Sequence, residues 1–303
     1  MAIEKEYLIN QSFSEILRNF KMNFLSLLTY PARHKLFLSK QISVLAERFY
    51  FDYTDTYTHP KKIYKVIDLL PKNKDLLFID AGAYIGYISE YFLKKSSNKS
   101  KVISIEPIQE YFVNLTSKLD KYNNNEERVF LIKKALNDKK SEKEFYYSKK
   151  YTASLTNSKE LAIDYYEPEG HLGKTKILTD TLDNLLEDLK IQYENIDLLK
   201  IDVEGSEKNV LKGFEKNINK TSVIIIEYGF FNILNDFTLR KIYQLYGDKF
   251  YIGKISLAKP YIYISEKYNV EWENFRFIDF ILINKDIKNH ETANFLLKNS
   301  SFI

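Results

Sequence analysis

Four short apolar runs in the sequence each end in an acidic side chain. The runs are rich in Ile and Val, and the residues that close them are Asp80, Glu106, Asp202 and Glu227. If the runs are parallel strands of one sheet, their carboxyl ends lie along one edge, where open α/β sheets bind their ligands. Four carboxylates along one edge predict a ligand that offers hydroxyl donors or positive charge.

The turn after the first run distinguishes two classes of cofactor. It reads Asp80-Ala81-Gly82-Ala83-Tyr84-Ile85-Gly86. A dinucleotide-binding turn has Gly at its first, third and sixth places, so that backbone amides can approach a pyrophosphate. With Gly82 at the third place, Asp80 and Ile85 occupy the other two, and with Gly82 at the first place the other two are tyrosines. Neither register fits, and Asp80 would repel a pyrophosphate but not a cofactor with an amino group and a sulfonium.

Glu106, which closes the second run, can accept hydrogen bonds from both hydroxyls of a ribose. Asp80 could instead be the N-cap of a helix, with Gly82 and Gly86 serving only a tight turn and close helix packing. The combination of this turn with Glu106 favours a nucleoside ligand over that alternative.

Apolar runs and amphipathic segments alternate from residue 61 to residue 303. Runs this short, bounded by Gly, Pro and Asn, are typical of buried parallel strands, and the segments between them are typical of crossover helices. The pattern predicts an α/β fold with a doubly wound, mostly parallel sheet. We count seven strands, at residues 76–80, 102–106, 129–133, 196–202, 223–227, 250–255 and 280–283, with helices at 63–70 and near Leu239.

Two regions depart from this alternation. Residues 1–60 are predicted to form a helical N-terminal extension, because apolar residues recur at helical spacing between Phe13 and Leu28. Its polar face is not strongly basic, so packing on the main domain (61–303) or on a second subunit, as in a homo-oligomer, is favoured over a membrane surface. Residues 139–180 are predicted to form an insertion near the active-site face, with strands at 144–147 and 176–178 beside a polar loop.

The composition excludes several functional classes. The 45 Lys and Arg are interleaved with 41 Asp and Glu, which leaves a net charge of +4 and no basic face for nucleic acid. The chain has no Cys, which excludes disulfides, zinc–thiolate sites and thiol nucleophiles and fits a cytoplasmic location. No run reaches the roughly 18 uncharged apolar residues of a membrane-spanning helix.

The segment from Ile196 to Glu207 carries the most specific pattern in the chain. It reads Ile-Asp-Leu-Leu-Lys-Ile-Asp-Val-Glu-Gly-Ser-Glu, a strand that continues into an acidic loop and then a helix. Together with four further segments, it resembles the FkbM family of methyltransferases over about residues 76–229. Those segments are Phe78–Gly86, Ile105–Pro107, Thr181–Asp183 and Ile224–Glu227.

The resemblance implies a class I methyltransferase fold, S-adenosylmethionine as the methyl donor, and a hydroxyl on a sugar or polyketide-derived product as the acceptor. By this analogy the turn at Asp80 holds the methionine end, Glu106 the ribose, and Ala135-Leu136-Asn137 borders the adenine. The family usually has Asn where this chain has Tyr84, which is a departure from the pattern. The predicted cofactor-binding residues are Asp80, Gly82, Ala83, Tyr84, Gly86, Glu106, Ala135 and Asp202.

Methyl transfer to a hydroxyl needs an acceptor oxygen in line with the sulfonium methyl and a destination for the hydroxyl proton. The predicted catalytic candidates are Asp202, Glu204, Glu227 and His171. Two converging carboxylates could also bind Mg²⁺, which would lower the pKa of the acceptor. Alternatively, Glu204 and Glu207 could cap the helix that follows, and His171 could be a surface loop residue.

The sequence therefore predicts an O-methyltransferase that acts on a hydroxyl of a carbohydrate or glycoconjugate precursor. Two other functions stay open at this point. One is a nicotinamide-dependent oxidoreductase on a similar sheet, which the glycine register disfavours. The other is a catalytically silent methyltransferase-like module that binds a partner through its N-terminal segment.

Overall fold

The computed structural model describes residues 59–123, 127–148, 155–156, 162–163, 172–257, 259–273 and 278–303. The chain divides into two compact units, Met1–His59 and Pro60–Ile303, and every described residue except His59 belongs to the second. Almost all of the expected N-terminal extension therefore lies outside the described residues, and its role as a cap or oligomer contact stays a prediction. Within the described part, no helix is both long and apolar enough to cross a membrane.

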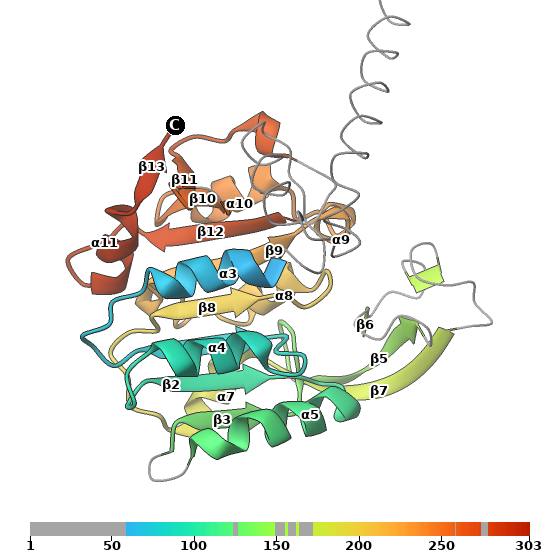
Figure 1. Cartoon of the computed structure of the whole chain (residues 1–303). Helices are drawn as coiled ribbons and strands as arrows, with labels where there is room; N and C mark the ends of the chain where they lie inside the picture. The colour runs from blue at the N-terminus through green and yellow to red at the C-terminus, as the bar shows by residue number, and fades with distance from the viewer. Residues whose placement is uncertain are drawn as a thin grey trace, which may run out of the picture. The chain divides into compact units, whose positions relative to one another are not determined.

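A mixed sheet forms the centre of the second unit (Figure 1). In the described part of the chain it has nine strands in the order β13-β11-β10-β12-β9-β8-β1-β2-β3. The strands from β9 to β3 are parallel, and β12 runs antiparallel to both of its neighbours. The strands are β1 (Leu77–Ala81), β2 (Lys101–Ile105), β3 (Val129–Ile132), β8 (Leu198–Ile201), β9 (Val223–Tyr228), β10 (Phe250–Ile255), β11 (Ile262–Ser265), β12 (Ile278–Asn284) and β13 (Ser300–Phe302).

All seven predicted strands are present, but the predicted number for the sheet is wrong. The two additional strands, β11 and β13, extend the edge beyond β10. β13 has only three residues, Ser300–Phe302, and none of them is buried. A strand this short and exposed leaves no apolar run in the sequence.

The central strands are mostly apolar because helices cover both faces of the sheet. All five residues of β1 are buried, and Phe78 and Ile79 belong to different apolar clusters. Successive side chains of a strand point to opposite faces, so these two clusters lie on the two sides of the sheet. Burial on both faces confirms the doubly wound α/β prediction.

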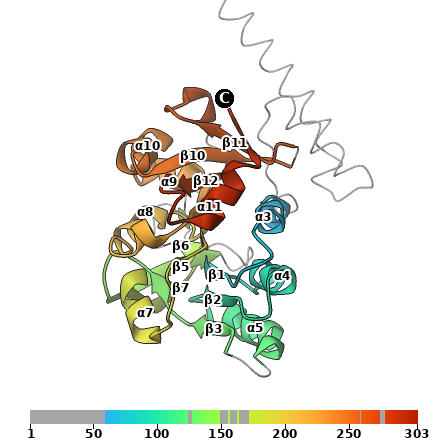
Figure 2. The same ribbon diagram turned by 90° about the vertical axis from the view of Figure 1, so that its left-hand side faces the viewer.

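The helices divide between the two faces (Figure 2). One apolar cluster includes residues of α3, α4, α5 and α11, and the other includes residues of α7, α8 and α10. The predicted helices at 63–70 and near Leu239 correspond to α3 and α10. The helices are α3 (His59–Asp68), α4 (Tyr87–Lys95), α5 (Gln109–Leu119), η1 (Asp120–Tyr122), α7 (Leu182–Leu189), α8 (Glu207–Lys212), η3 (Ile218–Lys220), α9 (Phe230–Leu234), α10 (Leu239–Tyr246), η4 (Val270–Trp272) and α11 (Glu291–Leu297).

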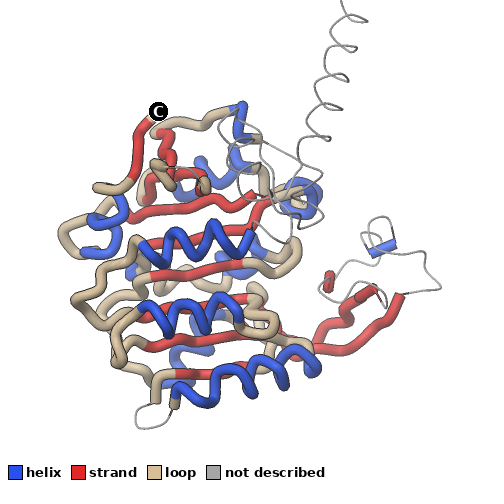
Figure 3. Tube along the Cα trace, viewed as in Figure 1, coloured by secondary structure: helices blue, strands red, loops and turns tan. Residues whose placement is uncertain are grey.

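A second, smaller sheet consists of three strands from the predicted insertion and one strand, β4, that precedes it. Its described strands have the order β4-β7-β5-β6 and comprise β4 (Ala135–Leu136), β5 (Ser141–Ser148), β6 (Leu155–Thr156) and β7 (Leu172–Asp180). β5 and β7 pair antiparallel along their length. They leave the main sheet at the side toward which the arrows of β2 and β8 point (Figure 1), and the same view in Figure 3 shows the two strands extending beyond the main sheet. Both strands predicted there are present, while the boundaries of the insertion stay a prediction.

Candidate functional site

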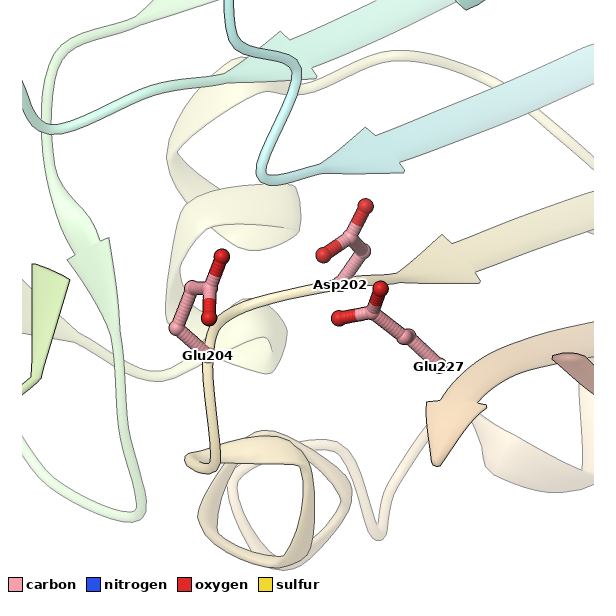
Figure 4. A group of neighbouring side chains, drawn as sticks. All are labelled: Asp202, Glu204 and Glu227. Atoms are coloured by element: carbon pink, nitrogen blue, oxygen red, sulfur yellow. The ribbon is translucent and has the colours of Figure 1, made fainter. Parts of the chain in front are cut away.

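Three of the predicted catalytic residues meet at the ends of β8 and β9. In the described part of the chain, Asp202, Glu204 and Glu227 each place a carboxylate oxygen within 4.8 Å of the others (Figure 4). All three side chains are half-buried. We call this group the carboxylate triad. Asp202 follows β8, Glu227 lies near the end of β9, and these strands are neighbours, so parallel pairing brings the two residues together.

The glycine turn lies beside the triad because β1 is the next strand after β8. Gly82, Tyr84 and Gly86 have φ values of 78°, 51° and 81°, which is the left-handed region that favours glycine. The backbone N–H groups of Gly82 and Ala83 both donate to the carbonyl oxygen of Ile105, each over 3.0 Å. The turn is therefore fastened to the end of β2.

Gly82 also touches the acidic loop directly. A Cβ atom at this position would lie 1.8 Å from the backbone oxygen of Asp202. The turn and the loop are thus in backbone contact, which only a residue without a side chain allows at this position.

Lys200 of β8 joins the turn to the loop. Its side chain is 2% exposed, and its Nζ lies 3.2 Å from Asp80 Oδ1 and 3.1 Å from Asp202 Oδ2. It also donates to the carbonyl oxygen of Gly82 over 2.9 Å. Burial acts to lower the pKa of Lys200, but the carboxylates of Asp202 and Asp80 outweigh it and raise the pKa above its usual value. Lys200 is therefore a permanent cation at the centre of the site.

Lys200 is a site residue that was not predicted from the sequence. The signal was present, since a lysine interrupts the apolar run Leu198–Ile201 and an aspartate follows two residues later. A charge inside a buried strand needs a partner of opposite charge, and the acidic residues at the ends of the neighbouring strands can provide it.

Asp80 occupies a buried polar network rather than an open surface. It accepts a hydrogen bond from Ser89 Oγ over 2.7 Å, and Ser89 lies 2.8 Å from Ser104 Oγ. In the sheet register, Asp80 stands between Ser104 and Lys200. Its predicted contact with the methionine end of a cofactor stays a prediction, while its link to α4 fixes the start of the turn.

Glu106 is held at the end of β2 by two backbone donors. Its Oε2 accepts from the N–H of Tyr84 and its Oε1 from the N–H of Ile108, both over 2.9 Å. Burial raises the pKa of Glu106 to about 7, against the effect of these two donors. The backbone of Tyr84 thus serves the site although its side chain departs from the family pattern, and its ring packs edge-on against Tyr111 with centroids 4.6 Å apart.

Glu207, considered above together with Glu204 as a helix cap, has a different role from Glu204. Glu207 is 1% exposed, and its Oε1 accepts from the N–H groups of Val203 and Gly205 over 2.9 and 3.2 Å. Its Oε2 accepts from Asn232 Nδ2 over 2.7 Å. Glu207 therefore holds the acidic loop in shape, while Glu204, with a φ of 55°, joins the triad.

The buried carboxyl of Glu207 makes stability depend on pH. Burial raises its pKa to about 7, from 4.5 for an ordinary glutamate. Between these values the folded chain holds a proton that the unfolded chain releases, so stability falls as pH rises through this window. We expect the decrease in the free energy of unfolding across this window to be about 1–3 kcal/mol smaller in Glu207→Gln than in the wild type. Urea unfolding at the two ends of the window measures it; Glu194→Gln, at an exposed position, is the control. Parallel pH curves for the wild type and Glu207→Gln would refute the assignment.

Two predicted site residues remain, Ala135 and His171. Ala135 is buried in β4, where it pairs with Thr179 of β7, and its predicted place beside an adenine stays a prediction. His171 lies outside the described residues, so its predicted role as a base is untested.

Known proteins resemble this chain in three comparisons. Residues 80–250, more than half of the chain, match the family described as "Methyltransferase FkbM domain". A stretch of 180 residues is 27% identical to the AMB antimetabolite synthetase AmbE of Pseudomonas aeruginosa, covering 50% of this chain but only 8% of that protein. A solved methyltransferase FkbM from Methylobacillus flagellatus is 15% identical, with 89% of this chain and 60% of that chain covered and a TM-score of 0.41. A solved O-methyltransferase from Bacillus cereus is 15% identical, with 82% and 91% covered and a TM-score of 0.40.

Proposed function

Because the chain belongs to the FkbM methyltransferase family, we propose that it transfers the methyl group of S-adenosylmethionine to a hydroxyl of a sugar or glycoconjugate precursor. The observation that carries this proposal is the convergence of Asp202, Glu204 and Glu227 beside the glycine turn. The turn and Glu106 offer a nucleoside site, and the triad offers proton acceptors next to it.

The geometry of Glu106 supports a ribose at the end of β2. Each of its two carboxylate oxygens accepts one backbone hydrogen bond. A carboxylate oxygen has a second lone pair, so both oxygens can each accept one further hydrogen bond, from the two hydroxyls of a ribose. The backbone donors orient the carboxylate for this contact before the cofactor binds.

The triad supports an acceptor with hydroxyl groups. In the reaction the acceptor oxygen attacks the methyl carbon, the bond from sulfur to that carbon breaks, and its electron pair stays on sulfur. The hydroxyl proton passes to a triad carboxylate, so the products are a methyl ether, S-adenosylhomocysteine and a protonated carboxyl. A sugar, whose neighbouring hydroxyls can donate to the other triad oxygens, fits three carboxylates better than an acceptor with one polar group.

The donor set of the triad also fits a hard divalent cation such as Mg²⁺, which prefers carboxylate oxygens. Asp202, Glu204 and Glu227 would hold it, and it would supply Lewis acid chemistry that lowers the pKa of the acceptor hydroxyl. Three carboxylates this close repel one another, which favours a bound cation, an acceptor proton, or both. Dialysis against a chelator separates the two roles, since activity that survives it comes from the carboxylates alone.

Glu227→Gln is expected to lower the rate of methyl transfer about 10²- to 10⁴-fold, the usual contribution of general acid–base catalysis. Binding of S-adenosylhomocysteine should stay unchanged, because Glu227 takes part in neither the turn nor the Glu106 contact. The rate is measured as release of S-adenosylhomocysteine in the presence of hydroxylated acceptors. Glu187→Gln, which removes an exposed carboxylate on α7, is the control. Full turnover by Glu227→Gln would exclude this residue from catalysis.

Methyl-labelled S-adenosylmethionine tests the proposed function. The chain is incubated with the labelled donor and a panel of monosaccharides, oligosaccharides and lipid-linked sugars. We expect label in a base-stable ether on at least one acceptor. Label on amines instead would overturn the hydroxyl acceptor, and cofactor binding without transfer to any acceptor would favour the silent binding module.

A further inference from the structure

We propose that Lys200 is a positioning residue that sets the distance between the cofactor turn and the carboxylate triad. This inference rests on the proposed function, in that the turn is taken to bind S-adenosylmethionine. The structural basis is that a single ammonium group contacts three parts of the site: the end of β1, the turn, and the loop after β8.

The ammonium group has three oxygen neighbours, two of them in ion pairs and one in a hydrogen bond. The three oxygens around Nζ are Asp80 Oδ1 at 3.2 Å, Asp202 Oδ2 at 3.1 Å and the Gly82 carbonyl oxygen at 2.9 Å. A buried charge is tolerated only with such partners, so the position of the ammonium dictates the positions of all three oxygens.

The contact with Gly82 orients the turn. Its carbonyl oxygen faces Lys200, and the N–H groups of Gly82 and Ala83 face Ile105. The next N–H group, that of Tyr84, donates to Glu106. The peptide groups from Gly82 to Tyr84 are thus held by Lys200 on one side and by β2 and Glu106 on the other.

The contact with Asp202 orients the triad. Since Lys200 lies 3.1 Å from Asp202 Oδ2, the rotation of this carboxylate within the triad is restricted. The same ammonium therefore fixes the turn that faces the methyl donor and the carboxylate that faces the acceptor. In-line transfer depends on this spacing, and an error of about 1 Å can lower a rate about 10²-fold.

A second ion pair, next to the start of β8, provides a control. Lys74 Nζ lies 2.9 Å from Asp197 Oδ1, and Asp197 directly precedes β8, whereas the triad lies beyond the other end of this strand. Asp197 is buried and also accepts from the N–H of Leu77 and from Thr292 Oγ1. Loss of Lys74, which is itself partly exposed, takes the cation from a buried aspartate without touching the turn or the triad.

The experiment compares Lys200→Met, the double variant Lys200→Met with Asp80→Asn, and Lys74→Met in the full chain. The double variant removes the buried charge that the single variant leaves without its cation, so its stability recovers. Binding of S-adenosylhomocysteine is measured by calorimetric titration, and amide hydrogen exchange is followed in peptides that cover residues 80–90 and 201–207. Thermal unfolding reports whether each variant is folded.

We expect the dissociation constant of S-adenosylhomocysteine to rise about tenfold or more in both Lys200 variants and to stay within about twofold in Lys74→Met. Amide exchange should rise in both peptides only when Lys200 is replaced. Recovery of binding in the double variant along with stability would overturn the inference, because it would make the role purely structural. Undiminished binding by folded Lys200→Met would overturn it as well. Failure of the wild-type chain to bind would instead overturn the proposed function, and the inference with it.

Discussion

Gly82→Ala is expected to abolish cofactor binding and methyl transfer. The added Cβ would lie 1.8 Å from the backbone oxygen of Asp202, and the residue has a φ of 78°, where alanine is strained by about 1–2 kcal/mol. A backbone oxygen cannot rotate away as a side chain can, so the turn and the acidic loop must separate. A displacement of this size should weaken binding of S-adenosylhomocysteine roughly 100-fold or more. Calorimetric titration measures the affinity.

Gly253→Ala is the matched control for this prediction. A Cβ there would lie 2.7 Å from the backbone oxygen of Tyr263, between β10 and β11, away from the triad. We expect this variant to lose stability but to keep its affinity for S-adenosylhomocysteine. If folded Gly82→Ala bound the ligand as tightly as the wild type, the contact between turn and loop would have no part in cofactor binding.

Glu106→Gln is expected to weaken binding of S-adenosylhomocysteine by about one to two orders of magnitude at alkaline pH. The carboxylate is assigned to the ribose hydroxyls, and a hydrogen bond to a charged group contributes about 1.5–3 kcal/mol. Glutamine has nearly the same shape but only one oxygen. One of the two backbone donors, Tyr84 or Ile108, therefore keeps its acceptor, the other faces the amide group, and the charge is lost.

The pH dependence of binding provides a second test of Glu106. Burial raises its pKa to about 7 in the cofactor-free chain. Binding through two accepted hydrogen bonds requires the ionised form, so affinity should fall by up to about tenfold per pH unit as pH drops below this value. We expect Glu106→Gln to flatten this profile and Glu110→Gln, at an exposed position on α5, to leave it intact. A wild-type affinity independent of pH would argue against a ribose at Glu106.

The acidic edge of the sheet could be predicted from the sequence because it depends on local pattern. Short apolar runs define β1, β2, β8 and β9, and parallel pairing then places the acidic residues at or after their ends along one side of the sheet. The family match over residues 80–250 confirms the resemblance that these motifs carried. The number of strands could not be predicted, since the outer strand β13 is short and exposed and has no apolar pattern.

The details of the site depended on distances that no local pattern contains. Asp80 and Lys200 are 120 residues apart in the chain and meet only because β1 and β8 pair with these two residues in register. Glu204 and Glu207 are both acidic residues of the same segment. Glu204 joins the triad because its backbone is left-handed. Glu207 stabilises the loop because three donors hold its carboxyl group.

We propose that the turn at Gly82 and the carboxylate of Glu106 form a site for S-adenosylmethionine. Calorimetric titration of the wild-type chain with S-adenosylhomocysteine tests it most directly. We predict saturable binding of one ligand per chain, and this binding should disappear when Gly82 is replaced by Ala. Absence of heat at saturating ligand, with the chain shown to be folded, would contradict the claim.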